Sequence, residues 1–94
     1  MANVTFNFAA LRLAAAEDTV TFMKFASAYN TYEIRCGKGL PSNKAADKAY
    51  SLLAQLQMNT KENLGVKTNV TLEEKEAVLD AIYAETVKAT RLAE

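Results

Sequence analysis

Basic residues, glycines and a proline gather between residues 35 and 48, and this stretch has the clearest ligand-binding character in the chain. The basic residues are Arg35, Lys38, Lys44 and Lys48, with Asp47 as the acid among them. Gly37 and Gly39 let the backbone approach a ligand closely, and the loop leads into a predicted helix whose free N–H groups favour anions. These residues predict a site for a phosphate or a nucleotide.

Three observations bear on this prediction. The stretch lacks the Gly-x-x-x-x-Gly-Lys-Ser/Thr frame of a P-loop. Tyr32 and Tyr50 are close enough in sequence to offer a stacking face for a base. An ordinary solvated turn, or contact with a charged protein partner, would need the same residue types, so these alternatives remain open.

The residues needed for catalysis are few. The chain has no histidine, which removes the commonest general base and metal ligand. Its one cysteine, Cys36, has no histidine to activate it or to complete a zinc site. Glu73, Glu76 and Asp80 share a helical face with the spacing to grip a cation, but solvated acidic faces commonly have this pattern. We therefore expect no enzymatic activity, no metal and no cofactor.

A heptad run of apolar residues covers much of the first 36 residues and predicts a helical seam that presses on another helix. Its members are Phe8, Leu11, Ala15, Asp18, Phe22, Phe25, Tyr29, Tyr32 and Cys36. Phe22, Phe25, Tyr29 and Tyr32 are the predicted partner-binding residues. The alternative is that they pack within the chain's own core, where Cys36 would be a small buried apolar residue.

The seam belongs to a first helical segment, from about Thr5, its expected cap, to Cys36. A second apolar rib, formed by Leu13, Ala16, Val20 and Met23, lies on another side of this segment. Thirty helical residues span about 45 Å, whereas a compact domain of this size is about 30–35 Å across. Either the helix breaks near Asp18, where Asp18 or Thr19 could cap a new helix, or another chain covers its overhang. The second possibility predicts a homo-oligomer.

Two further helical segments follow. The second runs from about Ser42 or Asn43 to Asn63, with Gly65 as its stop signal and an apolar stripe. That stripe consists of Ala45, Ala46, Ala49, Leu52, Leu53 and Leu56. The third begins with Thr71-Leu72-Glu73-Glu74, a capping box. Its inward stripe consists of Leu72, Val78, Leu79, Ile82 and Ala89. We predict an all-α fold, either a three-helix bundle or an elongated helical hairpin with a long first helix.

Composition sets the remaining expectations. Ninety-four residues predict a single domain over residues 1–94. Eleven basic and eleven acidic residues cancel, so no net field favours nucleic acid or a membrane surface as a partner. A lone cysteine fits a reducing cytoplasm, and no signal peptide or membrane-spanning stretch is visible.

These expectations together favour a non-enzymatic helical interaction or regulatory module that self-associates or binds a protein partner. The alternative function is a phosphate or nucleotide binder that uses residues 35–48.

Overall fold

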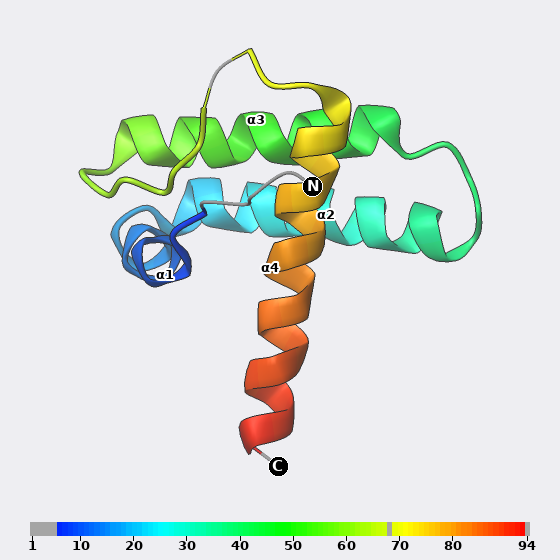
Figure 1. Cartoon of the computed structure of the whole chain (residues 1–94). Coiled ribbons are helices and arrows are strands. Elements are labelled where there is room, and N and C mark those ends of the chain that lie inside the picture. The colour runs from blue at the N-terminus through cyan, green and yellow to red at the C-terminus, as the bar shows by residue number, and fades with distance from the viewer. Residues whose placement is uncertain (1–5, 68, 94) are drawn as a thin grey trace.

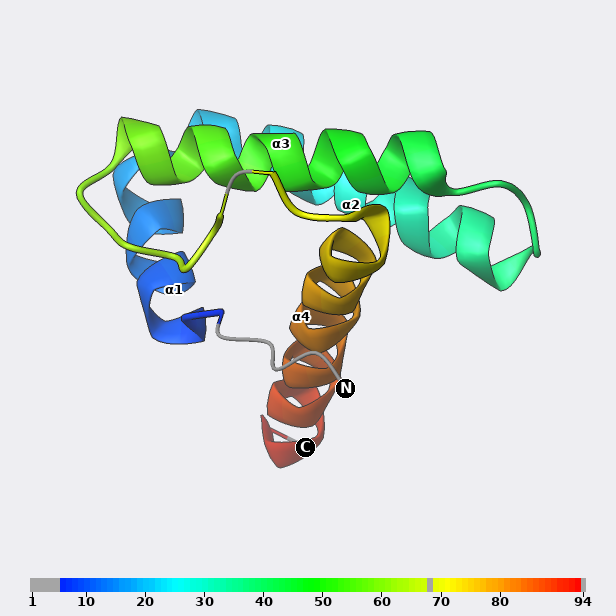
Figure 2. The ribbon, with the colours of Figure 1, turned by 45° about the horizontal axis from the view of Figure 1, so that its top comes forward.

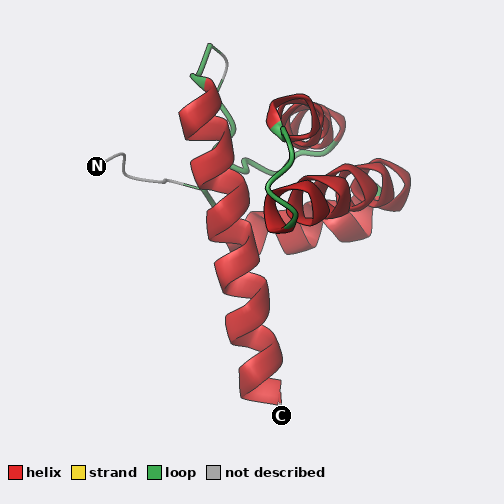
Figure 3. Cartoon of the chain, turned by 90° about the vertical axis from the view of Figure 1, so that its right-hand side faces the viewer, coloured by secondary structure: helices red, strands yellow, loops and turns green. Residues whose placement is uncertain are grey.

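The computed structural model describes the backbone of residues 6–67 and 69–93, and the side chains of residues 6–67 and 69–85. These residues form four helices: α1 (Phe8–Glu17), α2 (Thr19–Gly37), α3 (Asn43–Asn59) and α4 (Leu72–Ala93). In Figure 1, α2 and α3 lie side by side as an antiparallel pair, with α1 turned across one end of it. Figures 2 and 3 show α4 crossing one side of this pair and extending beyond it. The all-α prediction is confirmed, but the described helices number four rather than three.

The additional helix arises from a break at Asp18, one of the two alternatives that the sequence left open. The Asp18 backbone N–H donates to Ala14 (2.9 Å) and ends α1, while its Oδ1 accepts from the Thr21 N–H (3.1 Å) and begins α2. Hydrogen bonds from Thr21 to the Asp18 carboxylate lower the pKa of Asp18. The break removes the length argument for an oligomer, so self-association stays a prediction without that support.

Asn7 begins α1, because its Oδ1 accepts from the Ala10 N–H at 3.1 Å. The expected cap at Thr5 lies outside the described residues. At the start of α4, the Glu74 N–H donates to Thr71 Oγ1 at 3.2 Å, as the capping box predicts. Ser42 occupies the N-cap position of α3.

The second segment ends earlier than predicted, at Asn59 instead of Asn63. Thr60 has an extended backbone, and its hydroxyl donates back to the Leu56 carbonyl (2.8 Å), which closes the last turn. The next residues follow an irregular path that two α3 side chains hold in place. Gln57 bonds the backbone of Leu64 and Val66, and the Tyr50 hydroxyl bonds both the N–H and the carbonyl of Lys67 at 3.1 Å.

All four helices contribute to one core, against which the aromatic residues and Leu11 of the heptad seam pack. Phe25 is 3% exposed and Tyr32 is 2% exposed, and Leu53, Leu56, Leu64 and Leu79 are fully buried. Of the stripe predicted for the last helix, Leu79 and Ile82 are buried, whereas Leu72 is 39% exposed at the first turn. The side chain of Ala89 lies outside the described residues.

The second apolar rib has no partner among the described residues of the chain. Leu13, Val20 and Met23 are 57%, 66% and 65% exposed, and Ala16 is exposed as well. Cys36, predicted to be buried, is exposed in the last turn of α2, where its Sγ lies 3.5 Å from Ser42 Oγ. Its neighbour is thus a loop hydroxyl rather than the apolar core.

Candidate anion-binding groove

A groove lined by basic side chains runs between α2 and α3. Two adjoining cavities form it, with volumes of about 310 Å³ and 520 Å³, and they share Thr31, Ala45 and Lys48. The first is also lined by Lys24, Ser27, Ala28 and Leu52, and the second by Arg35, Pro41, Asn43 and Lys44. Four cations, two hydroxyls and an amide therefore line the same surface.

Helical spacing explains why α2 supplies four of these seven groups. Lys24, Ser27, Thr31 and Arg35 follow one another at intervals of three or four residues, which places them on one face of the helix. From α3, Lys44 and Lys48 are one turn apart on the facing side of the groove. Since both helices pack their other faces into the core, the groove is held by the most extensive interface in the described chain.

The loop between the two helices fixes Arg35 at one end of the groove. Arg35 Nε donates to the Pro41 carbonyl, and the Leu40 N–H donates back to the Arg35 carbonyl at 2.9 Å. The turn requires φ of +69° at Gly39, a conformation that glycine adopts without strain. Because the contact with Pro41 uses Nε, the two Nη groups of Arg35 can still donate to a ligand.

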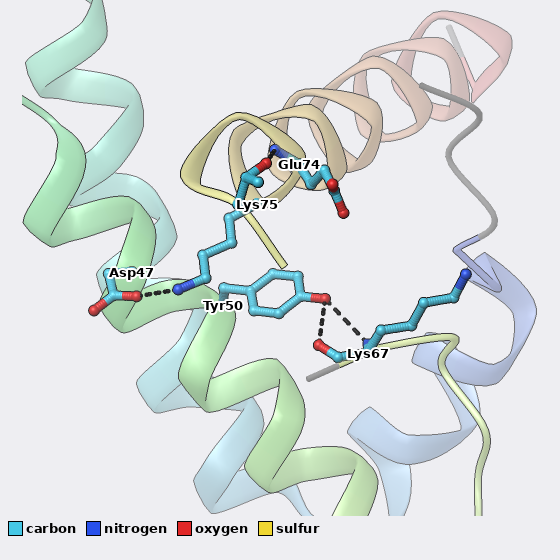
Figure 4. A network of polar contacts seen from close by, with 6 residues as sticks. Asp47, Tyr50, Lys67, Glu74 and Lys75 are labelled. Carbon is cyan, nitrogen blue, oxygen red and sulfur yellow. Dashed lines mark hydrogen bonds and ion pairs between the residues drawn. The ribbon is translucent and has the colours of Figure 1, made fainter. Parts of the chain in front are cut away.

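The acid nearest to these cations in sequence points elsewhere. Asp47 pairs with Lys75 of α4, and the Lys75 Nζ lies 5.9 Å from the centre of the Tyr50 ring (Figure 4). Among the residues that the structure describes, no acidic side chain lines either cavity. Near the end of the groove, Lys24 contributes to the lowered pKa of Asp18. The groove therefore carries a local excess of positive charge in a chain with none overall.

Three of the four predicted anion-binding residues, Arg35, Lys44 and Lys48, come together in the groove. Lys38 is exposed at the end of α2 and does not line either cavity. Sequence reasoning missed Lys24, Ser27 and Thr31, because it centred on the loop and did not extend to the face of the preceding helix. Their spacing relative to Arg35 was the signal that would have found them.

The two tyrosines expected to form a stacking face do not serve the groove. Tyr32 is buried and donates to Asp80 Oδ1 at 3.2 Å, and Tyr50 is buried and bonds Lys67. The four predicted partner-binding residues also turn inward. Phe25 and Tyr32 are buried, and Phe22 and Tyr29 pack against the same core. The ring centres of Phe22 and Phe25 are 6.1 Å apart, and those of Phe25 and Tyr29 are 5.6 Å apart. Phe25 and Tyr32 thus form intramolecular contacts, as the alternative interpretation held.

Acidic groups gather where α2 meets α4, away from the groove between α2 and α3. Burial is the larger cause that raises the pKa of Glu33, and repulsion from Asp80 adds to it. Burial also raises the pKa of Tyr29, whose hydroxyl is enclosed without a hydrogen-bond partner among the described residues. Glu73, Glu76 and Asp80 do not form a metal-binding group in the described part of the chain. Within residues 6–67 and 69–93, no helix combines the length and apolar character needed to cross a membrane.

The position of Glu33 predicts a pH dependence of stability. Because its pKa is higher in the folded protein than its ordinary value of 4.5, the folded state binds the proton more tightly. Stability should therefore rise as pH falls through the folded-state pKa toward 4.5. Glu33→Gln should raise the free energy of unfolding at pH 7, by less than about 1 kcal/mol because solvent screens a half-exposed charge, and should flatten this dependence.

Urea unfolding of the wild type and Glu33→Gln between pH 4.5 and 7 measures both effects. Glu85→Gln, at an exposed acid of α4, is the matched control and should leave the pH profile unchanged. A Glu33→Gln profile parallel to that of the wild type would show that folding does not raise the pKa of the Glu33 carboxylate.

Comparison of the chain with known protein families, with curated proteins and with solved structures gives no match.

Proposed function

We propose that this protein is a non-enzymatic binding module whose groove between α2 and α3 takes a phosphate-bearing ligand. The observation that carries the proposal is the convergence of Lys24, Arg35, Lys44 and Lys48 on one groove that no acid of the described residues lines. Like charges that line one groove repel one another, so anionic groups bound along it gain attraction from the cations that they approach and relieve part of this repulsion. The Ser27 hydroxyl adds a neutral donor for phosphate oxygens, whereas the Thr31 hydroxyl donates to the Ser27 carbonyl at 3.2 Å.

The proposal predicts that Lys44→Ala/Lys48→Ala abolishes binding of inorganic pyrophosphate and of nucleotides. Calorimetry and thermal melts in the presence of pyrophosphate, then of mono-, di- and cyclic nucleotides, provide the measurement. A ligand at about 100 times its Kd stabilises the folded state by about 2.7 kcal/mol, which a melt resolves easily. The double variant should lose this stabilisation while melting normally without ligand, since Lys44 and Lys48 are exposed.

Lys38→Ala supplies the matched control for this experiment. It removes the same charge from the same stretch of sequence, but Lys38 does not line the groove. Its ligand affinity should stay close to that of the wild type. Equal losses in Lys38→Ala and in the double variant would mean that general charge, and not the groove, attracts the anion. Absence of binding by every phosphate probe would end the proposal.

A second candidate function is contact with another protein or a second copy, which the exposed side chains of Leu13, Val20 and Met23 favour. Side chains this apolar and this exposed, when grouped, commonly mark interaction surfaces. We expect an oligomer whose mass falls to that of the 10.3 kDa chain in Val20→Lys/Met23→Lys. Native mass spectrometry at micromolar concentration tests this, and a wild type that is monomeric there would remove the candidate.

A further inference from the structure

We infer that the ligand of the groove is the sugar–phosphate backbone of a nucleic acid, bound without recognition of base sequence. This inference rests on the proposed function and specifies the class of its ligand. It follows from the length of the row of cations, from the residue types between them and from the distribution of charge over the molecule.

The row of cations is too long for one phosphate. Lys24 and Arg35 are eleven positions apart on α2 (35 − 24), which corresponds to about 16 Å along the helix axis. Phosphates of one strand advance about 3.4 Å each along a duplex axis, so a row of this length exceeds one phosphate and reaches several along a strand. Lys44 and Lys48 face the same groove from α3. A single phosphate would engage one end and leave the other cations unused.

The residues between the cations are those that contact a backbone rather than a base. Ser27 and Asn43 are of the types that donate to phosphate oxygens in nucleic-acid complexes, while the Thr31 hydroxyl is engaged with the Ser27 carbonyl at 3.2 Å. Within the described part of the chain, no aromatic side chain lines either cavity, and the nearby Tyr32 and Tyr50 are buried in the core. Binders of single strands and of nucleotides stack bases on exposed aromatic rings. The groove therefore has the donors for a phosphate backbone and lacks the platform for bases.

The zero net charge, which counted against nucleic acid in the sequence, conceals an uneven distribution of charge, because four cations line the groove while several acids lie on or beside α4. Glu33, Asp47 and Asp80 lie where the α2–α3 pair meets α4, and Glu73, Glu74, Glu76 and Glu85 also belong to α4. On α2, Tyr32 bonds Asp80 of α4 and Glu33 is repelled by the same carboxylate, whereas Thr31 and Arg35 line the groove. A polyanion responds to the local field of the groove more than to the total charge.

Fluorescence anisotropy of the full chain with labelled 24-base-pair duplexes tests the inference. Two DNA duplexes of unrelated sequence, and an RNA hairpin, should bind with affinities within about threefold of one another. Between 50 and 300 mM salt, the slope of log K against log salt should be near −3.6, or about −0.9 for each of four neutralised phosphates. Lys48→Ala should reduce the slope by about 0.9 and weaken binding about eightfold at 0.1 M salt, while Lys38→Ala should leave both unchanged.

The other outcomes are distinct. Binding of pyrophosphate or a nucleotide without binding of any duplex or hairpin overturns this inference and leaves the proposed function standing. Failure of every phosphate probe overturns both. A preference above tenfold for one duplex contradicts backbone binding. Sedimentation that shows a salt-sensitive dimer, lost in Lys48→Ala without any nucleic-acid binding, would assign the groove to the acidic α4 of a second copy and overturn the inference. Melts of each variant confirm that it is folded.

Discussion

Phe25→Ala is expected to lower the free energy of unfolding by about 3–5 kcal/mol, the usual loss when a buried phenylalanine is removed from a core. Phe25 is 3% exposed in the middle of α2 and packs between the rings of Phe22 and Tyr29. The substitution leaves a cavity among residues drawn from every helix, and the neighbours can fill it only in part. Urea unfolding followed by circular dichroism gives the value.

Met23→Ala is the control for this substitution, since Met23 lies on the same helix but is 65% exposed. Its effect should stay within about 0.5 kcal/mol. Native mass measured on both variants separates the two interpretations of the heptad seam. A Phe25→Ala variant of normal stability that has lost an oligomer would reassign the seam to an interface between chains.

Gln57→Ala is expected to destabilise the protein by about 2–3 kcal/mol, because one amide serves three backbone groups. Its Oε1 accepts from the N–H groups of Leu64 (2.9 Å) and Val66 (3.1 Å), and its Nε2 donates to the Val66 carbonyl (3.1 Å). Alanine leaves these partly buried groups without partners, at a cost of about 1–3 kcal/mol for a buried group. Because Leu64 is fully buried, the loop cannot leave the core to seek water.

Urea unfolding and amide hydrogen exchange test this prediction together. The amides of Leu64 and Val66 should exchange faster in Gln57→Ala, whereas Gln55→Ala, at an exposed position of the same helix, should change neither measurement. Gln57→Glu keeps the acceptor and loses the donor, so its loss should be intermediate. A loss in Gln55→Ala equal to that in Gln57→Ala would point to helix propensity instead of the three hydrogen bonds.

Local sequence patterns predicted the helices better than they predicted the polar contacts between them. Asp18 and Thr71 cap helices as predicted, because a capping side chain bonds backbone only three residues away. The roles of Gln57 and Tyr50 depend on a loop that passes 7 to 17 residues later in the chain. Nothing in the local pattern distinguishes Gln57 from Gln55 until the fold brings that loop alongside.

The candidate site shows the same division between local and distant determinants. Arg35, Lys44 and Lys48 were found because they cluster in sequence, whereas Lys24 joins them only through the periodicity of α2. The positive field of the groove also depends on Lys75, which draws Asp47 toward α4 from 28 residues away. Sequence proximity instead suggested that Asp47 would neutralise its basic neighbours.

The turn at Asp18 also limits what can cover the exposed apolar rib. On a straight helix, Leu13, Ala16, Val20 and Met23 would form one continuous ridge. The break instead leaves Leu13 and Ala16 on α1 and Val20 and Met23 on α2, and Figure 1 shows the two helices running in very different directions. Asn59 holds this corner by donating to both Asp18 Oδ2 (3.0 Å) and Thr21 Oγ1 (3.3 Å). A straight partner helix could therefore lie along one half of the ridge only, and a partner that covers both halves must itself bend or present a concave surface.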